Sequence, residues 1–126
     1  MEFKDKVAFV TGAGTGNGEA IAERLYAGGA SVVLASRHLA PVQSVCERID
    51  PEGERTLALE ADVRDPVAME SAVQQTVEQF GKLDLAVNNA GITGSAGVPT
   101  QEVEIDMWRD VIDTDLTGIF HSMKYE

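Results

Sequence analysis

The sequence predicts an α/β domain in which a parallel sheet is covered by helices on both faces, and three observations lead to that fold class. Short apolar runs alternate with longer segments of helical period, as in repeated strand–helix–strand units. The short runs are continuously apolar and bounded by turn residues, which is typical of strands buried by helices on both sides. A glycine-rich segment follows the first run directly. We therefore expect one doubly wound, three-layer α/β/α domain over residues 1–126.

Four strands and three helices can be placed from this pattern. We expect strands over 7–10, 31–35, 56–59 and 83–87. The first helix is expected over 19–27, ending at a Gly-Gly pair, and the second over 41–49, before a Pro-Glu-Gly break. The third has the clearest ends, because Asp65 is a capping residue, Pro66 suits the first turn and Gly81 follows the last apolar position. Its expected buried stripe is Met69, Ala72, Val73, Thr76, Val77 and Phe80.

The last third of the chain contains a loop and two further helical segments. Residues 91–100 are rich in Gly, Ser and Pro and follow the fourth strand, at the sheet edge where open α/β sheets bind ligands. Residues 103–112 and 116–125 have helical character. A sheet ordered 3-2-1-4 that stops here leaves the fourth strand as an open edge, so we predict self-association or a homo-oligomer through that edge or the apolar helix faces.

Composition excludes several function classes. A net charge of −11 without a basic cluster argues against binding to nucleic acid or to an anionic membrane. The charged start and the absence of a long apolar run predict a cytoplasmic protein without an export signal or membrane span. Cys46 is the only cysteine, so no intrachain disulfide or cysteine-based metal site is possible, and we predict no metal site. Its apolar helical neighbours indicate core packing for Cys46.

The strongest chemical signal is the segment Thr11-Gly-Ala-Gly-Thr-Gly-Asn-Gly18, which lies between the first strand and the first helix. Glycines allow the backbone to turn sharply and approach a pyrophosphate, and the N–H groups at a helix start bind its charge. A merely tight turn is the alternative. In this position the segment predicts a dinucleotide site at Gly12, Gly14, Thr15, Gly16, Asn17 and Gly18.

The spacing is T-G-x-x-x-G-x-G rather than G-x-G-x-x-G, and it resembles the glycine motif of the classical short-chain dehydrogenase/reductase family. Three further segments resemble that family in the same order: Asp62-Val63, Asn88-Asn-Ala-Gly91 and residues 108–120. Together these motifs span nearly the whole chain. The resemblance implies a Rossmann-like NAD(P)-binding domain from an oxidoreductase that acts on alcohol or ketone groups.

The resemblance also implies residue roles. It implies that Asp62 accepts a hydrogen bond from the adenine amino group beside Val63, with a strand-end cap as the alternative role of Asp62. Asn89, Ala90 and Gly91 resemble the segment that runs beside the cofactor ribose, whereas Asn88 resembles a residue that ties neighbouring strands together.

The end of the second strand bears on the choice between NAD and NADP. A carboxylate there would bind a free 2′-hydroxyl, but Ser36, Arg37 and His38 occupy this position. A guanidinium suits a 2′-phosphate, so we predict NADP as the cofactor, with NAD possible. Thr15 weakens the argument, since NADP-preferring relatives often have a basic residue in the glycine loop. Solvent exposure of Arg37 is the alternative, and His38 either stacks on the cofactor or is exposed.

Two positions depart from the family pattern. Asn17 stands where relatives have Ile or Leu, which leaves open a buried, destabilising amide or an exposed contact to the phosphates. Asp115 stands at the position of the catalytic asparagine, and an ionised carboxylate cannot act as a donor. Asp115 is therefore a doubtful catalytic residue, with a cap of the last helix as its alternative role.

The family's catalytic serine and Y-x-x-x-K pair are absent from these 126 residues, because Tyr125 has no lysine after it and reads as a surface residue. We expect a truncated copy, or partial chain, that binds cofactor without turnover. A non-catalytic nucleotide-binding or interaction module, or one half of a split enzyme, are the alternatives.

Overall fold

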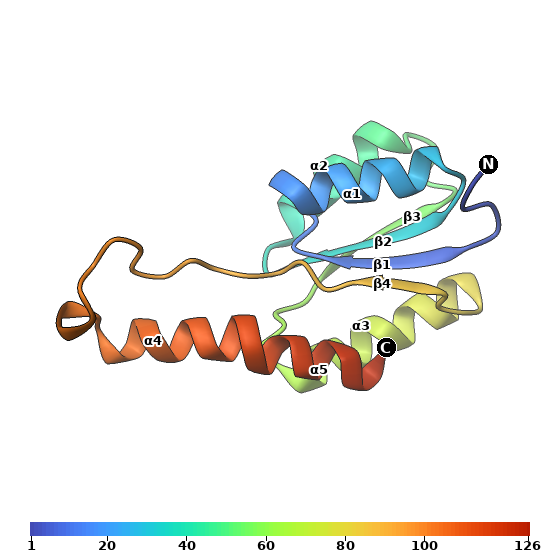
Figure 1. Cartoon of the computed structure of the whole chain (residues 1–126). Coiled ribbons are helices and arrows are strands. Elements are labelled where there is room, and N and C mark those ends of the chain that lie inside the picture. The colour runs from blue at the N-terminus through green and yellow to red at the C-terminus, as the bar shows by residue number, and fades with distance from the viewer.

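The computed structural model describes all 126 residues and contains a four-stranded parallel sheet in the order β3-β2-β1-β4. The strands are β1 (Val7–Thr11), β2 (Ser31–Ser36), β3 (Thr56–Glu60) and β4 (Leu85–Val87). Helices α1 (Gly16–Ala27) and α2 (Leu39–Ile49) cover one face, and α3 (Pro66–Phe80) covers the other together with the C-terminal helix (Figure 1). The predicted fold class and strand order are thus confirmed.

The two helical layers bury two separate clusters, because successive residues of a strand face opposite sides of the sheet. Ala8 and Val10 of β1 pack under α1 and α2, in the cluster that also contains Cys46. Phe9, between them, faces α3 and packs with Met69. The core role predicted for Cys46 is confirmed, and burial raises the pKa of its thiol.

A buried carboxylate joins the ends of α1, α2 and β3. Asp50 is 4% exposed and accepts hydrogen bonds from Arg55 N (2.8 Å), Thr56 Oγ1 (3.0 Å) and Tyr26 Oη (3.1 Å). Burial alone raises the pKa of the Asp50 carboxyl, but these donors outweigh it and hold the pKa below its usual value. Arg55 also stacks on the Tyr26 ring, 4.0 Å from its centroid. This cluster lies at the amino end of β3, whereas the glycine turn follows the carboxyl end of β1.

The third helix follows the prediction almost throughout. Asp65 caps it by accepting from Val67 N (3.0 Å), and Gly81 ends it in the left-handed conformation. The exception is Val77, which is 43% exposed at the margin of the predicted buried stripe.

Three boundaries were predicted wrongly. The first helix begins at Gly16, so the last glycines of the turn already belong to its first turn. The second begins at Leu39, two residues before Pro41. The fourth strand is only three residues long, because Asp84 turns its carboxylate onto the backbone N–H of Val7 at 2.8 Å.

The largest correction concerns the C-terminal third. Instead of two separate helices, α4 (Ile105–Ile112), a π-helical segment (Asp113–Thr117) and α5 (Gly118–Tyr125) form one long helix (Figure 1). A short 3₁₀ turn at Thr100–Glu102 precedes it. Tyr125 is half-buried against the α3-side core, not a plain surface residue as predicted. No helix has the length and apolar character required to cross a membrane.

Candidate functional site

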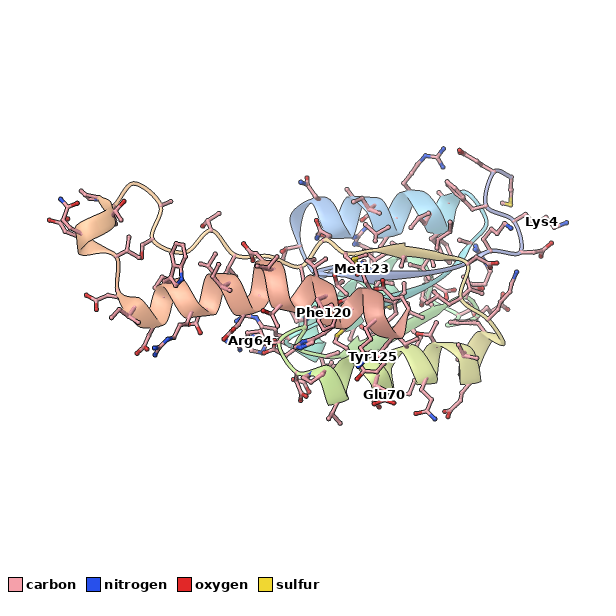
Figure 2. All side chains as sticks on the ribbon, turned by 60° about the horizontal axis from the view of Figure 1, so that its bottom comes forward. Lys4, Arg64, Glu70, Phe120, Met123 and Tyr125 are labelled. Atoms are coloured by element: carbon pink, nitrogen blue, oxygen red, sulfur yellow. The ribbon has the colours of Figure 1, made fainter.

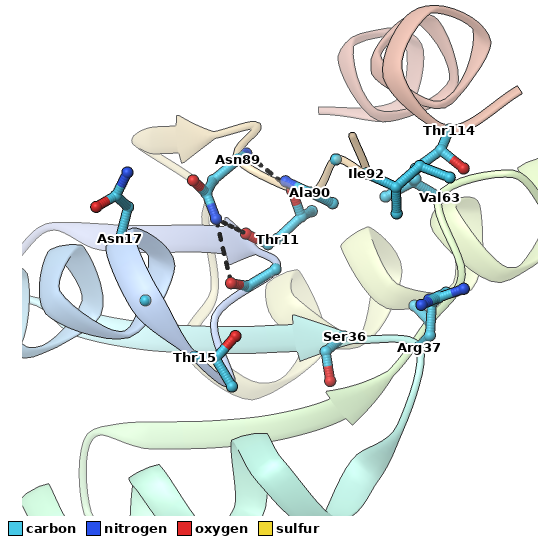
Figure 3. Close-up of a pocket in the computed structure, with 14 residues that line it drawn as sticks. Thr11, Thr15, Asn17, Ser36, Arg37, Val63, Asn89, Ala90, Ile92 and Thr114 are labelled. Atoms are coloured by element: carbon cyan, nitrogen blue, oxygen red, sulfur yellow. Dashed lines mark hydrogen bonds between the residues drawn. The ribbon is translucent and has the colours of Figure 1, made fainter. Parts of the chain in front are cut away.

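The main pocket lies at the carboxyl ends of the strands, between the glycine turn and the segment that follows β4 (Figure 3). Its volume is about 400 Å³. This is the crevice in which open α/β sheets bind ligands, next to the first strand. Its lining residues are Thr11, Gly12, Thr15, Gly16, Asn17, Ser36, Arg37, Ala61, Val63, Asn89, Ala90, Gly91, Ile92 and Thr114.

The glycine turn reaches the pocket because its backbone adopts conformations that side chains disfavour. Gly12 has φ +62° and Gly16 has φ +56°, both in the left-handed region. Gly18 does not line the pocket. It lies beneath the turn, where an added Cβ would stand 2.1 Å from the carbonyl oxygen of Gly12. The turn therefore needs Gly18 for packing, whereas Gly12 and Gly16 shape the pocket wall.

The amide of Asn89 joins the segment after β4 to the glycine turn. Its Nδ2 donates to the carbonyl oxygens of Thr11 (3.3 Å) and Gly12 (3.1 Å) (Figure 3). In return, the backbone N–H groups of Asn89 and Ala90 each donate to Thr11 Oγ1 at 3.1 Å. These four bonds fix the two walls of the pocket against each other. Thr11 was not among the predicted site residues, although its hydroxyl stands at a strand end beside the glycines.

Asn17 is exposed and lines the pocket. Of the two alternatives that the sequence left open, the exposed side chain is therefore the one observed. Its side chain stands on the first turn of α1 (Figure 3). The buried, destabilising amide is excluded.

A second hollow of about 220 Å³ adjoins the main pocket at the end of β2 and is lined by polar residues, glycines and one proline. Gly14, Ser36, Arg37 and His38 all border it. Arg37 borders both cavities, is exposed and forms no ion pair in the structure. The Ser36 hydroxyl donates to the carbonyl oxygen of His38 and so closes the turn that presents Arg37.

Asp62 stands between two lining residues, Ala61 and Val63, but does not itself line the pocket. Its carboxylate is bound by Arg64, with Nη2 2.7 Å from Oδ2. The hydrogen bonds from Arg64 hold the pKa of Asp62 below its usual value despite partial burial.

Asp115 lies in the π-helical segment, not at a helix start, so its alternative role as a helix cap is excluded. Its Oδ1 instead accepts from the backbone N–H of Ile92 at 2.8 Å and stands close to Gly91. The preceding residue, Thr114, is 5% exposed and lines the pocket. The π segment thus places Thr114 at the pocket and Asp115 at the loop beside it. π-bulges in helices often occur at functional sites. Neither Thr114 nor Ile92 carried a sequence signal that would have identified it.

Asn88 faces away from the pocket. Its Nδ2 donates to Glu126 Oε2 at 2.9 Å, rather than to a neighbouring strand. Burial raises the pKa of the Glu126 carboxyl, and Asn88 Oδ1 and Glu126 Oε1 have no partner. The predicted structural role of Asn88 therefore takes the form of a contact to the end of α5.

Solved structures of two proteins from Brucella melitensis share this architecture. A 3-ketoacyl-(acyl-carrier-protein) reductase complexed with NADH superposes with a TM-score of 0.91 at 34% identity, covering 97% of this chain and 48% of that chain. A short-chain dehydrogenase/reductase described as glucose/ribitol dehydrogenase gives 0.92 at 30% identity, covering 99% and 52%. Both matches cover nearly the whole of this chain but only about half of the other chain.

Curated relatives agree with the structural matches. The cyclohexanol dehydrogenase of Acinetobacter sp. is 42% identical over 99% of this chain and 49% of its own length. The 3-oxoacyl-[acyl-carrier-protein] reductase of Escherichia coli is 36% identical over 98% and 49%. The chain thus spans about half the length of the curated relatives it matches. A model of the short chain dehydrogenase family matches residues 6–125. The chain belongs to the short-chain dehydrogenase/reductase family, whose cofactor is NAD(H) or NADP(H).

Proposed function

We propose that residues 1–126 form a dinucleotide-binding domain that prefers NADP(H) to NAD(H). The preference is inferred from Arg37, which borders both cavities and has no ion-pair partner. A free guanidinium at the end of β2 suits a 2′-phosphate, where a carboxylate would be expected for NAD. Hydrogen bonds to charged groups contribute about 1.5–3 kcal/mol, and the exposure of Arg37 favours the lower end of that range.

The pyrophosphate fits the turn at the start of α1. The first N–H groups of a helix have no partner within the helix, and the helix dipole places partial positive charge there. Thr15, Gly16 and Asn17 line the pocket at this point without a carboxylate among them. The lining of the pocket, with Asn89 fixed on the opposite wall, supports binding of an extended anionic ligand along the strand ends.

For the protein as a whole we propose hydride exchange with an alcohol or ketone, in line with the names of its relatives. The serine and Y-x-x-x-K set implied by the family resemblance is not among these residues. We therefore propose that residues 1–126 alone bind cofactor without turnover. Asp115 contributes an acceptor to the loop after β4, and a catalytic role for it is not proposed.

Fluorescence titration with NADPH and NADH tests this function. We expect tighter binding of NADPH, and Arg37→Ala should weaken NADPH binding about tenfold while changing NADH binding by less than about twofold. Arg109→Ala is the matched control, because Arg109 is exposed on α4 and its one ion pair is with Asp106, at 3.9 Å. Absence of binding to either dinucleotide overturns the proposal, and tighter binding of NADH overturns the NADP preference. Turnover over a panel of ketones by this chain alone would contradict the non-catalytic assignment.

We also propose that the chain acts in the cytoplasm and self-associates. The single, buried cysteine is consistent with a reducing compartment. Self-association is supported by an outward apolar stripe on the long helix, formed by Ile105, Trp108, Leu116, Phe120 and Met123, each at least 62% exposed. The outer edge of β4 is also unpaired.

A further inference from the structure

Arg64 binds the Asp62 carboxylate through three donor groups: its backbone N–H, Nε and Nη2. Its Nε lies 3.1 Å from both carboxylate oxygens, its Nη2 lies 2.7 Å from Oδ2, and its backbone N–H lies 3.0 Å from Oδ1. Bidentate pairs of this kind fix orientation as well as charge, which distinguishes them from an ordinary surface ion pair. The Asp62 carboxylate is therefore held in one direction.

The Arg64 side chain extends to the long helix. Arg64 lies against this helix (Figure 2), and its Nη1 is 3.6 Å from Asp110 Oδ1 on α4. The neighbouring residue, Val63, is fixed to the same helix, because its carbonyl oxygen is 2.9 Å from His121 Nδ1. A Cβ added to Gly118 would meet the Val63 side chain at 2.6 Å, so the two segments are in close contact. Residues 62–64 are thus fastened to α4 and α5.

Arg37 lies near Asp62 but does not form an ion pair with it. Arg37 lines the same pocket as Ala61 and Val63, the two chain neighbours of Asp62. Its positive charge also contributes to the lowered pKa of Asp62, yet no ion pair joins the two side chains. Arg37 instead borders the polar hollow at the end of β2. Without the Arg64 side chain, the Asp62 carboxylate would keep only the backbone N–H of residue 64 and would lose its cation. It could then pair with the nearby guanidinium of Arg37 and repel a phosphate bound there.

We propose that Arg64 is a specificity-determining residue: by holding Asp62 on the α4 side, it leaves Arg37 available for the 2′-phosphate of the cofactor. This inference rests on the proposed dinucleotide function of the pocket. Arg64 acts through Asp62 and Arg37 and does not line the pocket itself. Its effect should therefore fall on the 2′-phosphate and not on the parts that NADH and NADPH share.

The test compares the ratio of the NADH dissociation constant to the NADPH dissociation constant in four proteins. Relative to the wild-type chain, Arg64→Ala should lower this ratio about three- to fivefold, the range of an exposed charge interaction. The double variant Asp62→Asn/Arg64→Ala removes the freed carboxylate and should restore the ratio to within about twofold of the wild-type value. Arg109→Ala removes one positive charge from α4 without contacting Asp62 and should leave the ratio unchanged.

The double variant separates this inference from a structural role of Arg64. General loosening of residues 62–64 would weaken both cofactors alike, or would persist in the double variant. An unchanged ratio in Arg64→Ala, an equal decrease in Arg109→Ala, or no recovery in the double variant overturns the inference and leaves the proposed function intact. A wild-type chain that binds neither dinucleotide overturns both. Far-ultraviolet circular dichroism of each variant verifies that the fold is retained.

Discussion

Gly18→Ala should disrupt the glycine turn through a steric overlap with backbone. The added Cβ would stand 2.1 Å from the carbonyl oxygen of Gly12 and 2.6 Å from Asn89 Nδ2. Alanine favours a helix over glycine by about 1 kcal/mol, whereas overpacking a well-packed site costs about 1–3 kcal/mol, and more where the obstacle is backbone. We expect a net loss of about 2 kcal/mol, which lowers the melting temperature by about 6–10 °C for a domain of this size.

Gly16→Ala is the matched control, because a Cβ at Gly16 meets nothing within 4 Å. Its cost is confined to the left-handed backbone, about 1 kcal/mol. Thermal unfolding followed by circular dichroism should therefore give Gly18→Ala a lower melting temperature than Gly16→Ala. If Gly18→Ala unfolds at or above the temperature of Gly16→Ala, the packing role assigned to Gly18 is wrong.

Three further predictions concern other parts of the molecule. Asp50→Ala should lower the free energy of unfolding by about 2–4 kcal/mol, because it leaves three partly buried donors unpaired. Since the folded pKa of Asp50 is depressed, this difference should be complete above about pH 5 and shrink below about pH 4, as urea melts across pH can show. Asp115→Ala should increase amide hydrogen exchange at Ile92, whereas Asp115→Asn, which keeps an oxygen acceptor, should not; equal exchange in both variants contradicts the contact. Leu116→Glu/Phe120→Glu should reduce the mass of any assembly measured by light scattering toward that of one 13.5 kDa chain, and a wild-type chain that stays monomeric at high concentration refutes self-association.

The sheet could be predicted because its central strands consist almost entirely of apolar residues. Val7 to Val10 and Val32 to Ala35 are buried on both faces, so continuous apolar runs identify them without knowledge of the partners. The ends of the third helix could also be predicted, since Asp65, Pro66 and Gly81 start or end the helix through contacts within a few residues of their own position. Local rules such as these need no tertiary information.

Other boundaries depend on contacts between distant residues and could not be read locally. The fourth strand is short because Asp84 binds the backbone of Val7, 77 residues away. The two expected C-terminal helices are one, because a π-helical segment continues the helix through residues 113–115, which the prediction left between them. Val77 fits the apolar period of α3 but lies beyond the width of the surface that the sheet and α5 cover.

The site shows the same division. The glycines and the segment 89–91 were predicted because their chemistry is tied to backbone position after a strand. Asp62 was predicted as a pocket residue, but its carboxylate is bound by Arg64, two residues later, which also lies 3.6 Å from Asp110 of α4. No motif or spacing rule predicts this pairing. The motif identifies which residues surround a pocket, whereas the side-chain pairs determine which of them face it.

Asp115 illustrates how a departure from a family motif can be compatible with the architecture. The contact observed at this position runs from the Ile92 N–H to a side-chain oxygen, so it requires only an acceptor. Both a carboxylate and an amide supply one, and the loop after β4 is held in either case. An amide would also offer donors, and only functions that use those donors are lost in the carboxylate. The substitution therefore separates two roles that asparagine would combine: the anchoring of residues 91–92, which this chain retains, and any donation to a neighbouring carbonyl or water, which an ionised Asp115 cannot perform.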